Sequence, residues 1–420
     1  MTSSRPVPEF LTLLEDAREA ARPLEQATTH QKNAALAELA DLLERHVDDI
    51  VTANTEDLER GIQGGLSTAL QDRLRLTPER VMGLARGVRD IIALPDPVGQ
   101  VVRGSTLANG IRIHQVRVPF GVVGAIYEAR PNVTVDIAAL AIKSGNAVVL
   151  RGGSAAESSN RVLVGLIQRA LGAVGLDPRA VCTVDPFGRE GATWLMRARG
   201  FVDVLIPRGS AQLIETVVTE SSVPVIETGA GVVHIFVDES ADVSRAIDIV
   251  VNAKVQRPSV CNAVETVLIH EAEAGMIPRL VSALQDKGVT IHGCEKVQAA
   301  ASGVVPATAE DWGTEYLSLD LSMKVVSGLD EALEHIRRYS THHTESILTA
   351  SLERAERFLK EVDSAVVMVN ASTRFTDGGE FGFGAEVGIS TQKLHARGPM
   401  GLPELTSTKW IVRGDGHIRA

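Results

Sequence analysis

The sequence predicts an α/β protein built from two parallel-sheet domains and a small antiparallel arm. From residue 120 to about 366, short apolar runs alternate with segments of helical periodicity, which is typical of parallel strands covered by helices on both faces. Residues 8–95 show helical periodicity alone, and residues 97–118 alternate apolar and polar side chains around Asn109-Gly110. A chain of 420 residues is long enough for two or three domains.

The first expected elements are the helices of residues 8–95. Thr77 is suited to cap a helix and Pro78 to begin it, which predicts a helix running to about Ile92. Beyond this helix, 99–103 and 111–118 read as two strands joined by the Asn-Gly turn. This ribbon has little apolar mass of its own, so we expect it to pack on something else, such as another subunit.

The central region is expected to form strands joined by helical crossovers. The predicted strands are 122–126, 147–150, 180–184, 202–206 and 223–226, and the predicted helices are 133–143, 158–172, 189–198 and 210–219. A second set of strands and helices runs from 232–236 to about 366. Glycine and proline dominate 377–403, and 408–413 is predicted to be one more strand, pairing outside the main sheets.

These patterns divide the chain into three expected parts. The first domain takes residues 1–103 and 122–230, the second takes 231–366, and the arm takes 104–121 and 385–420. An arm of this kind implies a homo-oligomer, a dimer or larger.

Composition argues against several classes of partner. The net charge is −11 and only 4% of the residues are aromatic, which disfavours nucleic acid and anionic membrane surfaces. No stretch reaches the roughly 18 apolar residues of a membrane span, and residues 1–8 lack the apolar core of a signal peptide. Three cysteines without a framework pattern indicate a reducing compartment. We therefore expect a soluble cytoplasmic protein.

Cys261 is the strongest candidate for a reactive side chain. It lies in a polar turn between a helical run that ends near Val255 and the apolar run 267–269. Arg257 is close in sequence, and a neighbouring cation favours the thiolate that a nucleophile requires. Cys182 falls in a predicted buried strand, where a cysteine is usually inert packing, and Cys294 has no obvious activator.

The segment around this cysteine reads Gln256-Arg257-Pro258-Ser259-Val260-Cys261-Asn262-Ala263-Val264-Glu265-Thr266. It resembles the nucleophile loop of the aldehyde dehydrogenase superfamily. Within it, the chain is similar to the gamma-glutamyl phosphate reductase family, also called glutamate-5-semialdehyde dehydrogenases. The other matching stretches follow in order along most of the chain and are 127–134, 150–154, 326–347, 370–375, 383–391 and 395–399.

The resemblance implies an aldehyde-dehydrogenase-like fold. In it, residues 1–103 and 122–230 bind NADP, 231–366 carry the nucleophile, and 104–121 with 385–420 form the oligomerisation arm. It also implies NADPH-dependent reduction of L-glutamyl 5-phosphate to L-glutamate 5-semialdehyde, the second step of proline synthesis from glutamate. Because an acyl phosphate is labile in water, a transient contact with the upstream glutamate 5-kinase, as a separate chain, is also expected.

The same resemblance assigns the chemistry. Cys261 attacks the gamma-carbonyl, phosphate leaves, and the thioester is reduced to a thiohemiacetal that collapses to the aldehyde. The Cys261 backbone N–H and the Asn132 amide match the oxyanion donors, although Asn132 taken alone reads as a turn residue. Glu227 matches the general base of hydrolytic relatives. A reductase needs no activated water, so we expect Glu227 to be structural or a proton shuttle.

The cofactor residues also come from the resemblance, because the chain has no Gly-x-Gly-x-x-Gly fingerprint of a standard Rossmann loop. Where NAD-preferring relatives often carry a carboxylate, this chain has Ser154, with Arg151 three residues earlier. A hydroxyl and a cation suit a 2′-phosphate, so we expect NADPH. The full expected set is Arg151, Gly152, Ser154, Arg208, Gly209, Ser210 and Glu315. In this set a helix opening at Gly209-Ser210 would hold the pyrophosphate, and Glu315 the nicotinamide ribose.

The substrate carries anionic groups, and three arginines on predicted site loops are candidates to hold them: Arg130, Arg257 and Arg374. Which arginine takes which group stays open. The pair His342-His343 suggests a metal site, but adjacent histidines point apart on most backbones and no third ligand is near. We therefore expect no metal.

Two alternatives remain open. One is an NAD-dependent hydrolytic aldehyde dehydrogenase, which Glu227 favours, whereas Ser154 and the short interval from Cys261 to Glu315 count against it. The other is a catalytically silent scaffold of the same fold, which the joint presence of Cys261, Asn132 and Glu315 disfavours.

Overall fold

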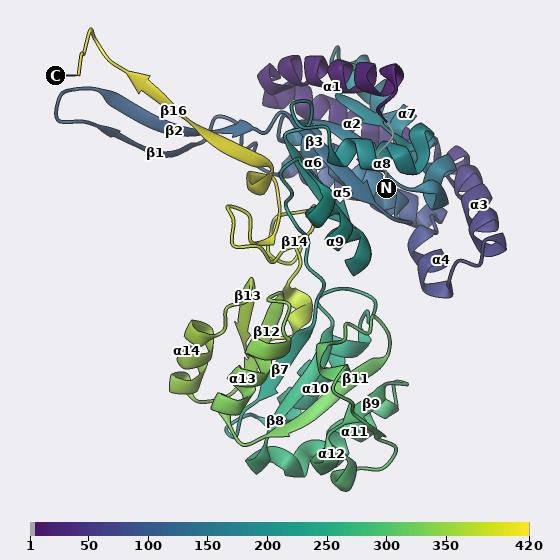
Figure 1. Ribbon diagram of the computed structural model, residues 1–420, viewed down its shortest axis with the longest axis vertical. Helices are drawn as coiled ribbons and strands as arrows, with labels where there is room; N and C mark the ends of the chain where they lie inside the picture. The colour runs from purple at the N-terminus through teal and green to yellow at the C-terminus, as the bar shows by residue number, and fades with distance from the viewer. Residues whose placement is uncertain (1–4, 420) are drawn as a thin grey trace. The chain divides into compact units, whose positions relative to one another are not determined.

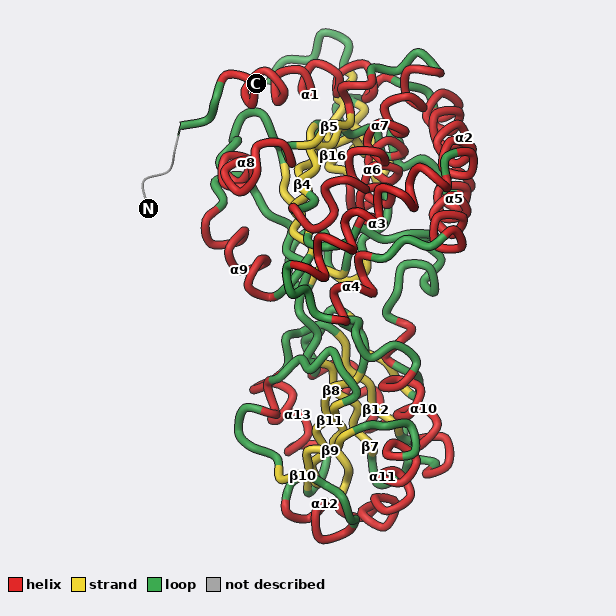
Figure 2. Tube along the Cα trace, turned by 90° about the vertical axis from the view of Figure 1, so that its right-hand side faces the viewer, coloured by secondary structure: helices red, strands yellow, loops and turns green. Residues whose placement is uncertain are grey.

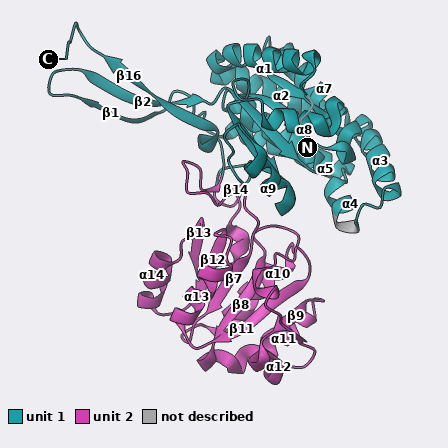
Figure 3. Ribbon diagram, viewed as in Figure 1, with its two compact units in different colours: residues 1–227, 382–388, 400–420 teal, residues 228–381, 389–399 magenta. Residues whose placement is uncertain are grey.

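Two parallel sheets carry the fold, one in each of two compact units (Figure 3). The structure is a computed structural model, and it describes residues 5–419. Unit 1 takes the described residues of Met1–Glu227 together with Gly382–Gly388 and Met400–Ala420; unit 2 takes Thr228–Phe381 and Ile389–Pro399. The expected boundaries differ from these units, because unit 2 extends past residue 366 and includes part of the segment assigned to the arm.

The helical start of unit 1 is confirmed. Its helices are α1 (Pro8–Gln26), α2 (Thr29–Arg45), α3 (Val47–Gln63), α4 (Thr68–Leu74) and α5 (Pro78–Ala93). The Arg80 N–H donates to the Thr77 hydroxyl at 3.2 Å, so Thr77 caps α5 as expected.

The sheet of unit 1 has four parallel strands in the order β5-β4-β3-β6. The strands are β3 (Val122–Tyr127), β4 (Ala147–Arg151), β5 (Val181–Thr183) and β6 (Val204–Arg208). The helices between and after them are α6 (Pro131–Lys143), α7 (Glu157–Ala173), α8 (Gly188–Met196) and α9 (Ala211–Glu220). Helices lie on both sides of these strands in Figure 2, as the apolar runs predicted.

One predicted strand of this sheet is wrong. Residues 223–226 form only an isolated bridge between Val225 and Leu205 of β6. Pro224 accepts a hydrogen bond from the Leu205 N–H at 2.8 Å, but it has no N–H to donate. The segment therefore makes too short a ladder to count as a strand.

A three-stranded antiparallel sheet extends from the α/β part of unit 1 (Figure 1). It contains β1 (Val101–Thr106), β2 (Arg112–Pro119) and β16 (Thr406–Arg413), in the order β1-β2-β16. The expected Asn109-Gly110 turn joins the first two strands, with Gly110 at φ +89°. Several large apolar side chains of this sheet are exposed, among them Val101, Val102, Trp410 and Val412.

The sheet of unit 2 has seven parallel strands in the order β10-β9-β11-β8-β7-β12-β13. These are β7 (Val233–Val237), β8 (Val264–His270), β9 (Thr290–Gly293), β10 (Val305–Pro306), β11 (Asp320–Val326), β12 (Thr344–Leu348) and β13 (Val366–Val369). The helices are α10 (Val243–Val255), α11 (Ile277–Gln285), α12 (Glu295–Ala300), α13 (Leu329–Tyr339) and α14 (Leu352–Glu361). A separate antiparallel pair joins β14 (Ile389–Ser390) to β15 (Gly398–Pro399).

Both faces of this sheet are buried. On one face Val267 and Ile269 of β8 pack in a core with α10 and α11, and on the other Leu268 packs with α13 and α14. Figure 2 shows α13 on one side of the strands and α10 and α11 on the other. Because neighbouring side chains of a strand point to opposite faces, the continuous apolar run of β8 serves both cores at once.

A buried carboxylate fastens the start of α7. Asp57 of α3 is fully buried and accepts the N–H groups of Ser158 and Ser159 at 3.0 and 2.8 Å, together with the Ser159 hydroxyl at 2.6 Å. These amides belong to the first turn of α7, where no helical partner exists and where the helix dipole favours an anion. The turn that Asp57 holds directly follows Ser154.

Replacing Asp57 with Ala should lower the free energy of unfolding of unit 1 by about 2–4 kcal/mol, because several buried donors lose their acceptor. Urea unfolding followed by tryptophan fluorescence measures this change. Asp48→Ala is the matched control, since Asp48 is an exposed carboxylate at the start of the same helix. Equal unfolding midpoints for the two variants would contradict the role given to Asp57.

Candidate active site

Cys261 lies where the chain enters the sheet of unit 2. It follows α10 and precedes β8 by three residues, and it is half-buried. The thiol therefore belongs to the amino-terminal edge of this parallel sheet. Cys182 is buried in β5, and burial raises the pKa of its thiol to about 12, which confirms its interpretation as packing. Cys294 is half-buried, and its sulfur accepts the Val325 N–H at 3.4 Å.

A glycine segment presses directly against the nucleophile loop. A Cβ atom at Gly231 would overlap the carbonyl oxygen of Cys261, so only glycine fits at this approach. The Gly231 N–H donates to Oε1 of Glu315 at 2.7 Å. Upstream, the Gly229 N–H donates to the Ile389 carbonyl at 3.0 Å. The structure thus brings Glu315 and Cys261, which are 54 residues apart in sequence, to either side of one backbone segment.

Arg374 is coupled electrostatically to both Arg257 and Cys261. Burial lowers the pKa of Arg374, and the charge of Arg257 lowers it further, while Asp377 and a Cys261 thiolate act in the opposite direction. Arg257 and Cys261 therefore each lie within electrostatic reach of Arg374. Two of the three predicted anion-binding arginines are therefore together in unit 2, and Arg130 belongs to unit 1.

Two amides orient Arg374, and neither was expected from the sequence. Its guanidinium donates to the side-chain oxygen of Asn262 and, through Nε, to that of Gln256 at 2.8 Å. Asn262 is itself buried and donates to the Thr376 carbonyl at 2.7 Å. Asn262 follows Cys261 directly, but its partners are 112 and 114 residues away, so no local pattern could have revealed them.

In unit 1, Asn132 and Arg208 both interact with Asp136. Asn132 lies in the first turn of α6 and donates from Nδ2 to Asp136 at 3.1 Å. Burial raises the pKa of Asp136 to about 6, against the Asn132 hydrogen bond and the charge of Arg208, which both lower it. Asp136 was missed, although its spacing of four residues from Asn132 places both on one helix face. Arg130 is the residue that precedes α6.

The segment after β4 is shaped by glycines. A Cβ atom at Gly152 would overlap the Asn160 side chain, and Gly153 has φ +76°. The Gly152 N–H donates to Asp185 at 2.8 Å, and Ser154 opens the short 3₁₀ helix Ser154–Ala156. This close backbone turn, with Arg151 before it and a hydroxyl after it, fits the approach of a dinucleotide along the strand end. Arg151 Nε is buried without a hydrogen-bond partner among the described residues.

The start of α9 already holds an anion. Oε2 of Glu128 accepts the Ser210 N–H at 3.3 Å and the Ser210 hydroxyl at 3.1 Å. Gly209 lies against the same carboxylate, since a Cβ there would stand 2.9 Å from Oε2. Helix N-termini favour negative groups, and in this structure the group is Glu128. The sequence analysis assigned this place to the pyrophosphate and did not consider Glu128.

Glu227 is half-buried and is the last residue of unit 1 before the Thr228–Phe381 segment of unit 2. It therefore directly precedes the glycine segment that reaches Cys261. Its role stays a prediction.

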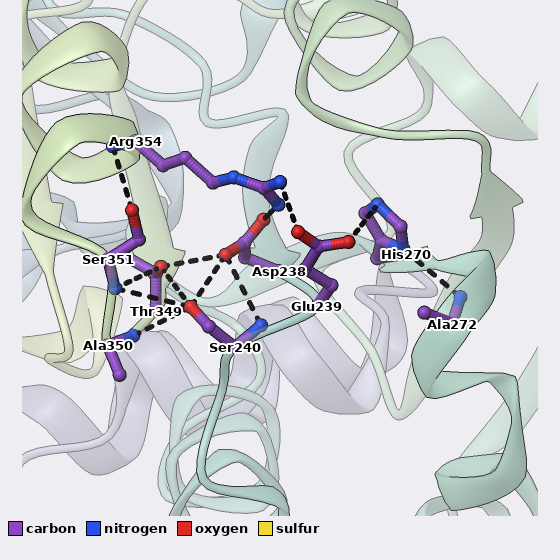
Figure 4. Close-up of polar contacts among 9 residues, drawn as sticks. All are labelled: Asp238, Glu239, Ser240, His270, Ala272, Thr349, Ala350, Ser351 and Arg354. Atoms are coloured by element: carbon purple, nitrogen blue, oxygen red, sulfur yellow. Dashed lines mark hydrogen bonds and ion pairs between the residues drawn. The ribbon is translucent and has the colours of Figure 1, made fainter.

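A second polar cluster lies at the opposite edge of the unit 2 sheet (Figure 4). Buried Asp238, after β7, binds Arg354 at 2.6 Å and the hydroxyls of Thr349 and Ser240 at 2.8 and 2.9 Å. Burial raises its pKa, but these partners together hold it below the usual range. Glu239 joins Arg354 to His270, the last residue of β8. Because the seven residues of β8 span about 20 Å, this cluster braces the far edge and takes no part in the Cys261 site.

Among residues 5–419, no group of three or more His, Cys, Asp or Glu side chains is arranged to hold a metal ion. No helix in the part of the chain that the structure describes is long and apolar enough to cross a membrane.

Comparison with known proteins decides the family. Residues 8–292 match the model of the aldehyde dehydrogenase family. Gamma-glutamyl phosphate reductase of Leifsonia xyli is 65% identical over 405 residues, which cover 96% of each chain. That of Clavibacter michiganensis is 63% identical, over 99% of this chain and 96% of its own. The chain belongs to the gamma-glutamyl phosphate reductase family of aldehyde dehydrogenases.

Solved structures agree with this assignment. The crystal structure of gamma-glutamyl phosphate reductase from Thermotoga maritima matches with a TM-score of 0.95 and 47% identity, over 98% of this chain and all of that one. An acetylating aldehyde dehydrogenase from Geobacillus thermoglucosidasius matches with a TM-score of 0.73 at 17% identity, over 98% of each chain, and shows the fold alone. The family and the aldehyde-dehydrogenase-like α/β fold expected from the sequence are confirmed.

Replacing Gly231 with Ala should displace the backbone of Cys261. Because the thiolate is the species that reacts, and it is less favoured when the donors and charges around the sulfur move, we expect the alkylation of Cys261 by iodoacetamide to slow by about 10-fold. Peptide mass spectrometry after timed alkylation follows this one cysteine. Gly275→Ala is the control, because a Cβ there meets nothing within 4 Å. An unchanged rate in Gly231→Ala would refute the close approach.

Proposed function

We propose that this chain reduces L-glutamyl 5-phosphate to L-glutamate 5-semialdehyde and releases phosphate. The observation that carries the proposal is a half-buried thiol within electrostatic reach of Arg374, in a chain that is 54–65% identical to several gamma-glutamyl phosphate reductases over nearly its full length. A cysteine nucleophile and an anion site are the two features that an acyl phosphate demands together.

The chemistry assigned to Cys261 is an acyl transfer. The thiolate forms a bond to the gamma-carbonyl carbon, the bond from that carbon to the phosphate oxygen breaks, and phosphate leaves with the electron pair. The Cys261 backbone N–H and, by its match to the family, the Asn132 amide are assigned to the negative oxygen of the tetrahedral species. The resulting thioester accepts a hydride, and collapse of the thiohemiacetal returns the thiolate and the aldehyde.

A nicotinamide cofactor, common to the family, supplies the hydride. We propose that it is NADPH, held by Arg151, Gly152 and Ser154 after β4, by Arg208, Gly209 and Ser210 at α9, and by Glu315 in unit 2. Support comes from the glycine turn, the cation and the hydroxyl at the end of β4, which suit a 2′-phosphate where a carboxylate would repel it. For the pyrophosphate to accept hydrogen bonds from the N–H groups at the start of α9, the Glu128 carboxylate has to move away from the Ser210 N–H.

The phosphate group is proposed to bind between Arg257 and Arg374. Burial lowers the pKa of Arg374, and the like charge of Arg257 lowers it further; an anion between the two arginines would relieve this repulsion. Asn262 and Gln256 hold the Arg374 fork in place. Arg130, which precedes the Asn132 helix, is proposed for another anionic group of the substrate. Glu227 is proposed to be structural or to shuttle a proton, because reduction of the thioester leaves no water to activate.

Assembly and location complete the proposal. The sheet of β1, β2 and β16 exposes large apolar side chains, and we propose that it packs against a second copy of the chain to form a dimer or larger homo-oligomer. A transient contact with a separate glutamate 5-kinase would shorten the exposure of the labile substrate to water. A cytoplasmic location fits three cysteines that are all thiols.

The decisive measurement is the reverse reaction with glutamate semialdehyde, NADP or NAD, and with or without phosphate. Formation of NADPH that requires phosphate, and that disappears in Cys261→Ala but not in Cys294→Ala, is expected. Reduction of either cofactor without phosphate would instead favour a hydrolytic dehydrogenase with Glu227 as general base. No turnover at all would favour a silent scaffold.

In the same assay, Arg374→Gln should raise KM for phosphate by about 10- to 100-fold, because one charged hydrogen bond to a ligand contributes about 1.5–3 kcal/mol. The KM for the cofactor should change little. Arg245→Gln is the matched control, since Arg245 lies on the same unit with its side chain 84% exposed. A phosphate KM within twofold of the unsubstituted protein would exclude Arg374 from the phosphate site.

A further inference from the structure

A buried ion pair lies just behind the nucleophile loop. Lys254 of α10 and Glu265 of β8 are both fully buried, and Nζ of the lysine is 2.5 Å from Oε2 of the glutamate. Taking two charges out of water is costly, and well-packed apolar residues of similar volume often give equal or greater stability. A pair of this kind is therefore weakly explained by stability alone.

The second carboxylate oxygen of Glu265 reaches the loop that carries Glu315. Oε1 accepts the N–H of Leu317 at 3.3 Å. Leu317 has φ +55°, a left-handed backbone conformation that is costly for a side chain of its kind and persists only when the surroundings impose it. Glu265 thus holds the loop in a conformation that it would not choose by itself.

Lys254 contributes to the same loop from the other side. Its Nζ lies 5.9 Å from the ring centroid of Tyr316, within reach of a cation–π contact. The Tyr316 hydroxyl is fixed by Asp311 at 2.7 Å and by Ser322 at 2.9 Å. The two residues that follow Glu315 therefore each contact one member of the ion pair: Tyr316 contacts Lys254, and Leu317 donates to Glu265.

The loop in turn controls the nucleophile. Glu315 binds the Gly231 N–H at 2.7 Å, and the Gly231 backbone presses on the carbonyl of Cys261. Burial lowers the pKa of Lys254 and raises that of Glu265 to about 7, and the charge of Glu315 acts on both, in the direction that raises each pKa. A series of direct contacts thus connects the ion pair to the loop of residues 315–317, and that loop to Cys261.

We propose that Lys254 and Glu265 are positioning residues of the reaction site, which set the Glu315 loop and, through Gly231, the backbone of Cys261. The importance of this position for turnover rests on the proposed function. The placement of the loop and of the thiol does not, and it can be measured without substrate or cofactor.

The test separates positioning from stability by removing both charges together. In the double variant Lys254→Met, Glu265→Leu the buried volume is nearly kept, so the midpoint of urea unfolding should stay close to that of the unsubstituted protein. The Leu317 N–H nevertheless loses its acceptor. We expect faster amide hydrogen exchange in peptides covering 228–232 and 314–318. Alkylation of Cys261 by iodoacetamide should slow by about 10-fold, because the reactive thiolate is less favoured when the groups around the sulfur move.

The control is the ion pair of Lys324 and Glu331, 3.0 Å apart on β11 and α13 of the same unit. Lys324→Met, Glu331→Leu should leave exchange in 228–232 and 314–318 and the alkylation rate unchanged. Native exchange and a native alkylation rate in the Lys254, Glu265 double variant would overturn the proposal.

A single substitution covers the case in which the double variant does not fold. Glu265→Gln keeps the volume and an oxygen for Leu317, but it removes the negative charge that holds Lys254. Exchange in 314–318 should rise, and unchanged exchange would overturn the proposal. If exchange and alkylation respond as expected while phosphate-dependent turnover is absent from the unsubstituted protein, the proposed function fails and the positioning role stands.

Discussion

The contact between Gly231 and the Cys261 carbonyl is the constraint on which the rest of unit 2 depends. No side chain other than hydrogen fits there, so the segment before β7 and the loop before β8 must be placed together. Two hydrogen bonds hold the glycine segment in place: the Gly231 N–H donates to Glu315, and the Gly229 N–H donates to the Ile389 carbonyl. The reactivity of the thiol is consequently a property of backbone geometry as much as of nearby charge.

Charges in the two units are arranged toward different tasks. Near Cys261, two neutral amides hold the Arg374 guanidinium, which does not neutralise its charge, and Arg257 lies within electrostatic reach of it. At the start of α9 the opposite holds, because Glu128 already neutralises the helix terminus. In the first arrangement Arg374 donates to neutral amide oxygens, which leave its positive charge in place, and the second pairs a helix terminus with a carboxylate of the same unit.

The two edges of the unit 2 sheet carry different groups: the candidate nucleophile lies at one edge, and a cluster of paired charges lies at the other. The amino-terminal edge carries Cys261 and the loops that place it. The carboxyl-terminal edge carries Asp238, Glu239 and Arg354, whose charges are paired, and His270, which contacts Glu239. A fully paired cluster restrains strand ends without offering a group to a ligand, so the loops at the other edge can serve chemistry.

Local patterns in the sequence were sufficient for most of the elements, and the family motifs were sufficient to name candidate site residues. Apolar runs with helical crossovers predicted both parallel sheets, and only 223–226 failed, because Pro224 cannot donate to a ladder. The family motifs singled out Cys261, Asn132 and Glu315, since each of these residues lies in a short contiguous sequence motif. The supporting contacts came only from tertiary structure: Asn262 meets Arg374 across 112 residues, and Asp57 meets Ser158 across 101. Such pairs leave no periodicity, because a hydrogen bond between distant segments depends on where the fold places two backbones and on nothing in the residues between them.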